Sequence, residues 1–578
     1  MAAIINALDN FTPKQFGENG HVEYGWSNSL KEKIVQFSFQ VTRTDDNGIK
    51  KLGSILNSML VELKNKIDNG SLPEKEVAKG YLSILYRMVG QTRDIIDGKG
   101  EYKLAYMMVY TWSKFYPELA KFALRCFVTL DGEKVHQYGS WKDLKYFCDY
   151  CKEQNKDANS PIIDYAVELM NEQIASDYSK LMAGYNDISL AAKWAPREKS
   201  SFGWLYNALA TNYFGQYLAT ASNDVSVRKA TLKCKTEYRK VLSTLNKKID
   251  TLQIKQCGKE WSAIDFNKVT SISLGKNKKA FLNIKKNGEV RCPNNQDRIE
   301  CAEHFNAHIQ KAVKGEVEMK GKRVGMADFT KQAYELLVSN NNQNERDLLN
   351  SQWRDNSSQN GALGKMIAMV DVSGSMSGDP MEVAIALGIR IAEKSVLGKR
   401  IMTFSANPTW VNLEPYHDFI SQVDVVRKAD WGMNTNFHAA LDMILNAIVE
   451  NKMAAEDVQD MVLVILSDMQ MDDGDNCNKD TLYQTMVKKY ADAGIRVNGT
   501  PYKPPHILFW NLRSTGGFPT LSSQPNTSMM SGFSPVILNL FCEQGMESLQ
   551  SCTPWSLLLK SLDNERYKVM SNKLEREI

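Results

Sequence analysis

Long apolar segments and a secretory signal are both missing from this chain of 578 residues. None of its apolar runs approaches the length of about 20 residues that a membrane-spanning helix needs. The N-terminal stretch MAAIINALDNFTPKQFGENG has no basic segment followed by an apolar one, which is the pattern of a secretory signal. We therefore expect an intracellular, cytoplasmic protein that does not interact with membranes.

Cysteines are few, and the motifs of common enzymes are absent. The ten cysteines are scattered along the chain and do not frame a small domain, which favours reduced thiols. The chain contains no Gly-x-Ser-x-Gly elbow, no His-Glu-x-x-His motif and no phosphate-binding P-loop. These absences favour a binding protein that is not an enzyme.

The charge of the chain is unevenly distributed, although its formal net value is only +4. Residues 191–330 contain 26 Lys and Arg against 13 Asp and Glu, so this segment carries +13 and the remainder −9. A basic segment of this kind attracts polyanions such as nucleic acid. The alternative is that these side chains cover the solvated faces of ordinary helices.

The first part of the chain, up to about residue 340, has the pattern of successive helices. Apolar residues recur at helical spacing in segments such as 81–89 and 102–112, and short breaks with Gly or Pro separate them. Helices paired by short turns predict an all-α, HEAT-like helical-repeat region over 81–340, although no sharp sequence period is present. We expect residues 1–80 to be helical too, and 268–290 leaves room for a small hairpin.

The pattern changes after residue 340. The segment 341–362 is rich in Asn, Gln and Ser and predicts a polar linker. Beyond it, residues 363–578 alternate short apolar strands with helices, which predicts a Rossmann-like α/β domain with a parallel sheet. The predicted strands are 366–370, 401–405, 461–466, 506–512 and 535–540, and the predicted helices are 381–394, 437–449, 482–493 and 546–562.

Oxygen-bearing side chains follow two of these strands. Asp371, Ser373 and Ser375 come directly after the first strand, and Asp468 follows the strand 461–466. Thr435 lies at the start of the helix between them. Ligands of open α/β sheets bind at the carboxyl ends of the strands, and oxygen ligands suit Mg²⁺ or Mn²⁺. The sequence therefore predicts a divalent-metal site at this edge of the sheet.

The same residues resemble the metal-ion-dependent adhesion site (MIDAS) of von Willebrand factor A (vWA) domains. The resemblance implies that Ser373, Ser375 and Thr435 contact the metal directly, and that Asp371 and Asp468 bind it directly or through water. It also implies that an acidic group of a protein partner completes the coordination. Two alternatives remain open, namely a polar cluster that binds no metal and a vWA fold with a vestigial site.

A second group of residues has the composition of a zinc site. If their segment is helical, Cys301, His304 and His308 share one face, and Cys292 precedes them. The spacing of Cys292 fits no established zinc pattern. Burial of Cys and His on a helix face is the competing explanation.

Helical repeats followed by a vWA domain resemble the Ro autoantigen and its TROVE-domain relatives. Supporting segments are the sequences Thr-Arg-Asp-Ile-Ile-Asp-Gly-Lys-Gly-Glu at 92–101 and Tyr-Gly-Ser-Trp-Lys-Asp-Leu at 138–144. The resemblance implies a ring of helices that the vWA domain closes and that binds small noncoding or misfolded RNA. The sequence itself leaves open whether these helices close into a ring.

Other segments are more similar to a family of Ro-like proteins of giant viruses, plants and fungi, for which no activity is established. The similar segments are 192–200, 261–271, 466–472 and 509–513. Together they span most of the chain from about residue 80. This resemblance implies a fold more firmly than a function.

Two classes of function follow from these observations. The first is a ribonucleoprotein component whose basic segment binds RNA and whose vWA domain binds a metal and a protein. Trp194 and Trp204 could stack on bases, although both could equally fill helix contacts. The second is a protein-interaction scaffold, for complex or virion assembly, without RNA binding. The residues expected to contact RNA are Lys193, Arg197, Lys199, Arg228, Lys229, Lys276, Lys278, Lys279, Lys285 and Lys286.

Overall fold

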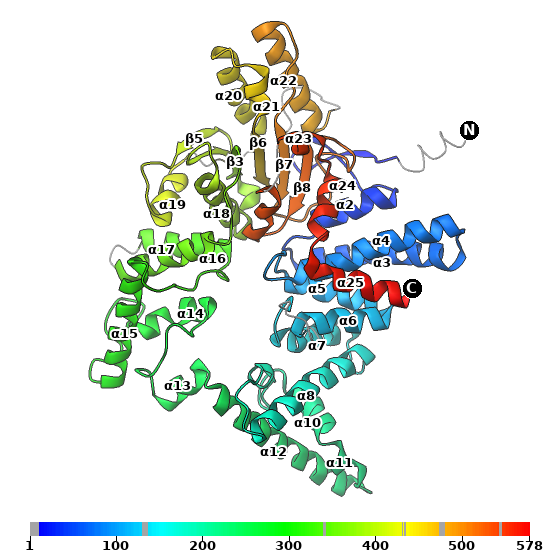
Figure 1. The fold of residues 1–578 in the computed structure, drawn as a ribbon, viewed down its shortest axis with the longest axis vertical. Helices are drawn as coiled ribbons and strands as arrows, with labels where there is room; N and C mark the ends of the chain where they lie inside the picture. The colour runs from blue at the N-terminus through cyan, green and yellow to red at the C-terminus, as the bar shows by residue number, and fades with distance from the viewer. Residues whose placement is uncertain are drawn as a thin grey trace.

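The protein consists of a mostly helical N-terminal region and a C-terminal α/β domain, as seen in a computed structural model (Figure 1). The structure describes residues 11–129, 137–338, 343–429, 432, 435–472, 480–542 and 546–578. Within these ranges, no helix combines the length and the apolar character needed to cross a membrane.

The N-terminal region is built from helices whose boundaries follow local signals in the sequence. Proline occupies the first position of the helices that begin at Pro117 and Pro161, where its missing N–H costs no hydrogen bond. Ser71 and Glu74 form a capping box at the start of another. The helices are α2 (Leu30–Gln40), α3 (Asp46–Asn69), α4 (Leu72–Arg93), α5 (Tyr102–Ser113), α6 (Pro117–Val128), α7 (Lys142–Asn155), α8 (Pro161–Met182), α9 (Ala191–Trp194), α10 (Gly203–Tyr213), α11 (Gly215–Ala219), α12 (Asp224–Ile249), α13 (Leu252–Gly258), α14 (Ser271–Phe281), α15 (Gln296–Val313), α16 (Met326–Val338) and α17 (Gln343–Ser357).

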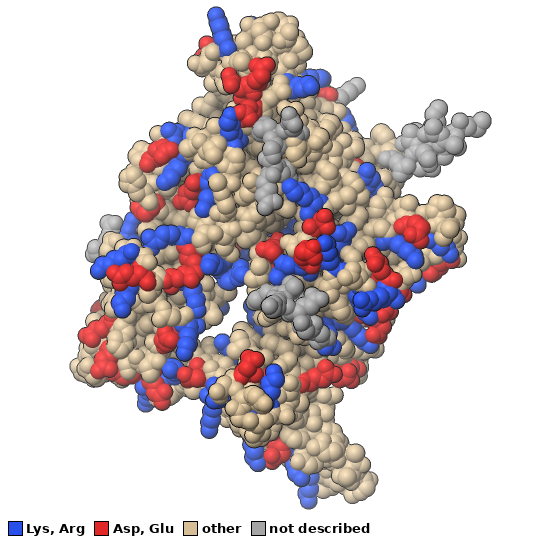
Figure 2. Space-filling model, in the orientation of Figure 1, with Lys and Arg blue, Asp and Glu red and all other residues tan. Residues whose placement is uncertain are grey.

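These helices follow a path that leaves the α/β domain and returns to it. In Figure 1 the chain descends through α3 to α8, turns at α10 to α12, and climbs through α13 to α15 to reach α16 and α17. Helix α16 packs on α18 (Asp379–Lys394) of the α/β domain, which completes the circuit. Figure 2 shows an opening between the two limbs, with Lys and Arg side chains at its edge.

The α/β domain contains a six-stranded sheet in the order β5-β4-β3-β6-β7-β8. All neighbouring strands are parallel except the edge strand β5, which is antiparallel to β4. The elements are β3 (Met366–Asp371), α18, β4 (Arg400–Phe404), β5 (Thr409–Asn412), α19 (Phe419–Arg427), α20 (Phe437–Glu450), α21 (Ala455–Gln459), β6 (Val462–Ser467), α22 (Leu482–Asn498), β7 (His506–Asn511), β8 (Thr527–Ser531), α23 (Met546–Ser551), α24 (Pro554–Leu562) and α25 (Glu565–Glu577).

Alternate residues of the central strands enter two different cores, as expected for a sheet covered on both faces. Val464 and Leu466 of β6 join the core formed with α16, α18 and α19. Leu463 and Ile465 join the core that contains α20 and α22 and continues into the N-terminal helices. The sheet is therefore part of the packing that links the two regions.

Several predictions for the α/β domain are wrong in detail. Residues Pro535–Phe541 form a short 3₁₀ helix, and the last strand is β8. The antiparallel strand β5 was not predicted. Thr553 and Pro554 divide the predicted helix 546–562, because proline cannot continue the preceding helix. Helix α25, at the end of the chain, packs on α4 and α6 of the helical region.

Two predictions for the rest of the chain are also wrong. Residues 1–80 are not wholly helical, since β1 (Lys14–Phe16) and β2 (Val22–Tyr24) form an antiparallel hairpin. The predicted linker 341–362 contains α17, whose buried face includes Leu349 and Trp353. Its polar composition concealed a narrow apolar stripe. The hairpin expected within 268–290 is only a single bridge between Ile284 and Val290 that follows α14.

A buried polar network joins α4, α5 and α7 to α25 at the end of the chain, and the Tyr106 hydroxyl of α5 contributes by donating to Asp143 of α7. Arg93 donates two hydrogen bonds to Asp143, at 2.9 and 2.7 Å. Its neighbour Asp94 accepts two from Arg566, both at 2.7 Å, and one from the Tyr567 hydroxyl at 3.0 Å. Both carboxylates are fully buried. A buried carboxylate is tolerated only when it is paired and hydrogen-bonded, so these contacts hold the four segments together.

Lys99 extends this network to the sheet. Its ammonium group donates to the carbonyls of Ser38 and Val41, at 2.9 and 2.8 Å, and to the Ser531 hydroxyl at 2.7 Å. Ser38 lies near the end of α2, and Ser531 ends β8. Burial lowers the pKa of Lys99 to about 7. Lys99, a side chain of the helical region, thus donates hydrogen bonds to acceptors at the C-terminal end of α2 and on the outer strand β8.

Replacing Arg566 with Ala should lower the free energy of unfolding by about 3 kcal/mol, because it leaves the Asp94 carboxylate buried without its cation. Urea unfolding measures this change. The control is Lys568→Ala, since Lys568 pairs with Glu565 on the surface and its loss should have little effect. Equal effects of the two substitutions would show that the network does not hold the regions together.

Candidate functional site

The predicted metal residues lie at the point where the strand order of the sheet reverses. Numbered along the domain, the strands follow the order 3-2-1-4-5-6, and β3 and β6 are the adjacent central pair. Ligands of doubly wound sheets bind in the crevice beyond the carboxyl ends of such a pair. Asp371 ends β3, and Asp468 directly follows β6. The fold therefore brings the two carboxylates to one place.

Asp371 is fully buried, and no cationic side chain of the described residues pairs with it. Its carboxylate accepts a hydrogen bond from the backbone N–H of Ser373 at 3.0 Å and one from the Ser467 hydroxyl at 2.6 Å. Burial and the nearby charge of Asp468 raise the pKa of Asp371 to about 7, against the opposing effect of these hydrogen bonds. A divalent cation at this position would oppose the shift, because its charge favours the ionised carboxylate.

The predicted hydroxyl ligands border the same place. The hydroxyls of Ser373 and Ser375 lie 3.2 Å apart, at the start of a 3₁₀ turn over Gly374–Met376. Thr435 is tied to the loop after β6, because its N–H donates to Asp472 at 2.8 Å. The Thr435 hydroxyl is buried and has no hydrogen-bond partner within the described part of the chain. Residues 430, 431, 433 and 434 of the preceding segment lie outside that part.

A strained loop positions Asp468. Met469, which follows it, has a φ of +63°, a region that side chains other than glycine rarely adopt. Hydrogen bonds from Met469 N–H to the Ser467 hydroxyl and from Gln470 N–H to Asp468, both at 3.0 Å, hold this conformation. Strain of this kind persists where the surroundings determine the backbone, which is common at functional sites.

Arg513 is the only cationic side chain that the described residues place against the two carboxylates. Its Nε donates to Asp468 at 2.8 Å. This guanidinium pairs with Asp468, and no cation of the described residues pairs with Asp371, so the two buried carboxylates carry an excess of negative charge. The sequence analysis did not identify Ser467, Asp472 or Arg513 as site residues, although 466–472 and 509–513 were among its family-like segments. Their roles depend on contacts between distant segments.

The alternative zinc site does not form. Cys301 is buried among Phe266, Phe281 and Phe305, and burial raises the pKa of its thiol to about 11. His304 is exposed, with its Nδ1 at 3.2 Å from the Ser262 carbonyl. Among the residues that the structure covers, no three or more His, Cys, Asp or Glu side chains are placed to hold a metal. The prediction that Cys301, His304 and His308 lie on one helix was correct, but Cys301 and its neighbours contribute to the hydrophobic core and not to a metal site.

The residues predicted to contact RNA fall into separate groups. Lys193, Arg197, Lys199, Arg228 and Lys229 belong to α9, α12 and the loop before α10, which pack together. Lys276, Lys278 and Lys279, predicted to be in a loop, belong to α14.

Two of these lysines are committed to ion pairs. Lys278 pairs with the buried Glu345 at 3.2 Å, so its role is structural. Lys285 pairs with Glu289 at 2.9 Å in the turn after α14, beside the exposed Lys286. Because Lys278 and Lys285 are paired with carboxylates, neither is well suited to binding phosphate.

Lysines from the two limbs of the helical region approach one another. Burial lowers the pKa of Lys142 at the start of α7, and the charges of Arg93 and Lys276 lower it further against the effect of Asp143. Burial and the charge of Lys142 likewise lower the pKa of Lys145. Figure 1 places α7 and α14 on opposite sides of the opening. Like charges held together in this way form a favourable position for an anion.

Aromatic rings surround Lys145. Its ammonium group lies 4.8, 5.6 and 4.9 Å from the ring centroids of Tyr146, Trp194 and Phe202. Tyr146 and Phe202 meet edge to face at 5.6 Å. Tyr146 is exposed, and Trp194 and Phe202 are partly exposed. Trp204 belongs to the same surface, with Lys152 at 4.7 Å from its ring. Lysine and aromatic side chains therefore alternate on this face.

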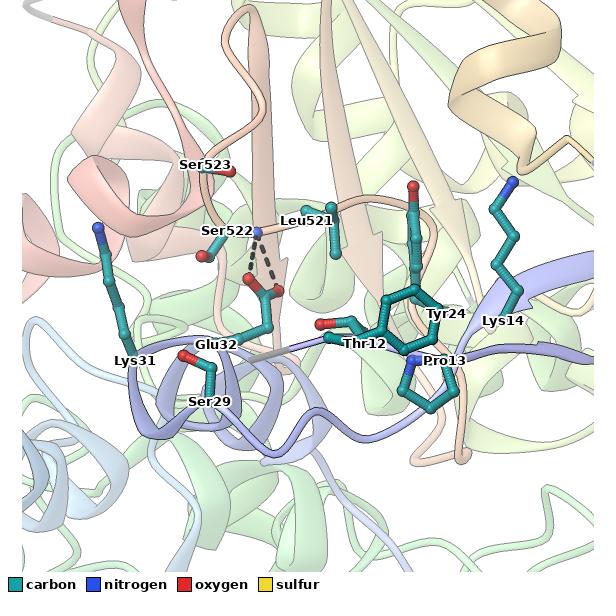
Figure 3. Close-up of a pocket in the computed structure, with 11 residues that line it drawn as sticks. Thr12, Pro13, Lys14, Tyr24, Ser29, Lys31, Glu32, Leu521, Ser522 and Ser523 are labelled. Carbon is teal, nitrogen blue, oxygen red and sulfur yellow. Dashed lines mark hydrogen bonds between the residues drawn. The ribbon is translucent and has the colours of Figure 1, made fainter. Parts of the chain in front are cut away.

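A separate pocket of about 790 Å³ lies between the N-terminal hairpin, the start of α2 and the loop Leu521–Ser523 (Figure 3). The Glu32 carboxylate projects into it and accepts a hydrogen bond from Ser522 N–H, at 2.9 and 3.0 Å from its two oxygens. Figure 3 shows Lys31 and Lys14 on either side of this carboxylate. The pocket contains none of the predicted metal or RNA residues, and Glu32 of α2 already accepts a hydrogen bond from the loop that lines the pocket. We therefore place the functional site at the sheet edge and on the helical limbs.

The fold and site define a helical region joined to a doubly wound α/β domain with a cluster of oxygen ligands at its switch point. Residues 148–358 match a family model described as a domain of unknown function (DUF2828). Residues 365–574 match a second, described as a domain of unknown function (DUF7788). The boundary between these matches falls between the end of α17 and the start of β3.

A viral relative matches nearly the whole chain. "Uncharacterized protein L728" of Acanthamoeba polyphaga mimivirus is 27% identical over 566 residues, which is 95% of this chain and 87% of that protein. This match agrees with the resemblance to a giant-virus family that the sequence analysis found. The relationship includes the N-terminal segment, which the sequence analysis had left unassigned.

Replacing Asp371 with Asn should stabilise the protein at pH 8 in the presence of a chelator. The pKa of Asp371 rises from 3.8 to about 7 on folding, so its contribution to stability is largest below pH 3.8. That contribution falls by roughly 4 kcal/mol as the pH rises through about 7. Asparagine cannot ionise, so the advantage of the variant in urea unfolding should grow from pH 5 to pH 8. A difference that stays constant with pH would show that the pKa of Asp371 is not raised in the folded protein.

Proposed function

We propose that this protein is a non-enzymatic RNA-binding component of a ribonucleoprotein. In this proposal the helical region is a HEAT-like ring that binds RNA, and the α/β domain is a vWA domain that binds Mg²⁺ or Mn²⁺ and a protein partner. The closed path of helices and the strand order with Asp371, Ser373 and Ser375 after β3 support this assignment. The sequence resemblance to Ro and vWA proteins supports it as well.

The lysine cluster at the opening is the observation that carries the RNA proposal. Lys142, Lys145 and Lys276 make no ion pair with any carboxylate of the described residues, whereas many other lysines of the protein do. Holding like charges together without a counterion is unfavourable, and phosphate groups would remove that cost. Binding to phosphates also releases condensed counterions, which adds to affinity.

The aromatic side chains beside the cluster define which nucleic acid is favoured. Tyr146, Trp194 and Phe202 offer partly exposed ring faces and edges next to Lys145. Unpaired bases stack on such rings, whereas the bases of a duplex are already stacked on one another. The proposal is therefore for single-stranded RNA segments, with Lys193, Arg197 and Lys199 as further phosphate contacts on the same group of helices.

Replacing Lys142, Lys145 and Lys276 together with Gln should weaken binding of single-stranded RNA and flatten its salt dependence. If about six phosphates are contacted, the wild-type log–log salt slope should be about −4, and the triple variant should lose about a third to a half of it. Filter binding at a series of salt concentrations measures both.

The control removes the same net charge from surface ion pairs, by replacing Lys64, Lys121 and Lys568 with Gln. Equal losses in the two triple variants would show that only overall charge matters. If wild type binds no RNA at low salt, the proposal fails, and a protein-interaction scaffold becomes the better account.

The metal proposal is supported by the chemistry of the site. Asp371, Ser373, Ser375, Thr435 and Asp468 would hold the ion. The unpartnered Thr435 hydroxyl and the excess negative charge fit a small divalent cation that prefers oxygen ligands. When bound, the ion would neutralise the two carboxylates and leave a coordination position for an acidic group of a partner.

Calorimetric titration with millimolar Mg²⁺ should give binding heat with wild type and none with Asp371→Ala. The affinity should rise from pH 6 to pH 8, because the Asp371 carboxyl must lose its proton, with a pKa of about 7, before it can bind a cation. RNA affinity should be the same in both proteins, since the lysine cluster lies on other elements. A wild type that gives no heat would refute the metal site.

A further inference from the structure

The N-terminal hairpin lies across the edge of the sheet that carries the metal residues. Gly20 forms a backbone bridge with Asp472, and Tyr24 exchanges two backbone hydrogen bonds with Phe518, both at 2.9 Å. A Cβ atom at Gly517 would lie 1.7 Å from the carboxyl carbon of Glu23, so only glycine permits this approach. The hairpin is thus built into this face.

The tip of the hairpin holds the loop that follows Asp468. Gln470 is buried, and its side-chain oxygen accepts from Glu18 N–H at 2.6 Å. The Asn19 side chain donates to the Gln470 carbonyl at 2.9 Å, and the Gln470 amide donates to Glu23 at 3.2 Å. Three residues of the hairpin therefore hydrogen-bond to Gln470, which lies two positions after the predicted metal ligand Asp468.

Arg513 connects this hairpin with the metal residues themselves. Its guanidinium donates to Asp468 at 2.8 Å through Nε and to Glu18 at 2.7 Å through Nη2. The Asp468 side chain is fully buried, whereas that of Glu18 is 58% exposed and that of Arg513 33% exposed. The contact with Asp468 is consequently the stronger of the two, and the contact with Glu18 is weak and exchangeable.

A cation at the metal site would compete with Arg513 for the same carboxylate. Asp468 has the Arg513 guanidinium and the Gln470 N–H as its hydrogen-bond donors in the described structure. A divalent ion that draws on the Asp468 charge weakens the attraction of Arg513 to it and repels the guanidinium. Glu18 is then the acceptor that remains for Arg513.

We propose that Arg513 couples occupancy of the metal site to docking of the N-terminal hairpin, by exchanging between Asp468 and Glu18. The proposal rests on the metal site proposed above. Metal binding shifts Arg513 toward Glu18 and tightens the hairpin, and hairpin docking in turn raises metal affinity, as linkage requires. Arg513 and Glu18 are positioning residues that do not contact the ion.

Calorimetric titration of Mg²⁺ at pH 8 into three single variants tests this coupling. Arg513→Gln removes the competitor and should raise Mg²⁺ affinity about tenfold. Glu18→Gln leaves Arg513 on Asp468 and should lower the affinity about threefold. In the Arg513→Gln background, Glu18→Gln should have no effect, because the residue that transmits it is gone. Lys14→Gln, which removes a hairpin charge that contacts Gln484, should leave the affinity unchanged.

Hydrogen exchange provides a readout that does not depend on affinity. Amides of 16–24 should become more protected when Mg²⁺ is added to wild type, and should not respond in Arg513→Gln. The coupling alone would be overturned if Arg513→Gln and Glu18→Gln changed the Mg²⁺ affinity in the same direction. It would also be overturned if Lys14→Gln changed the affinity as Arg513→Gln does. Absence of Mg²⁺ heat in every variant would overturn the metal site and the coupling together.

Discussion

The closed arrangement of this protein depends on a few buried charges in residues 92–101. Arg93 and Asp94 are adjacent, yet their partners Asp143 and Arg566 come from different parts of the chain. Each pair is bidentate and shielded from water, so its geometry is strictly determined. On the other side, α16 packs on α18 and α19, and its Phe329 contacts Trp353 of α17 and Phe419 of α19. A helical region attached to the α/β domain at both ends can keep Lys142 and Lys145 of α7 close to Lys276 of α14.

Charge is balanced differently in the structural and the functional parts of the molecule. In the network around residues 92–101, every carboxylate has a cationic or hydroxyl partner, and even Lys99 has three acceptors. At the carboxyl ends of the strands, Asp468 pairs with Arg513 but Asp371 pairs with no cation of the described residues, and at the opening three lysines have no carboxylate of the described residues paired with them. An excess of negative charge on one set of elements and an excess of positive charge on another are what independent cation and phosphate sites require.

The local sequence pattern was sufficient to predict most helices and strands. It failed where tertiary packing determined the structure. The central strands and α18, α20 and α22 were predicted because strand and helix periodicities are strong there. Helix α17 was taken for a linker, because its stripe of Leu349 and Trp353 is narrow within a polar sequence. The segment 535–540 is apolar like a strand, but β8 occupies the place beside β7.

The sequence by itself determined the two-part organisation and which oxygen-bearing side chains follow the central strands, because the order of strands along the chain and the residues that end them are local properties. Asp371 and Asp468 had to meet once β3 and β6 were neighbours. Only the tertiary structure decided which charges are neutralised, because that depends on contacts between segments hundreds of residues apart. Lys278 looked available in the sequence and is paired with Glu345, whereas Lys142 became a proposed phosphate contact only because Lys276 lies near it.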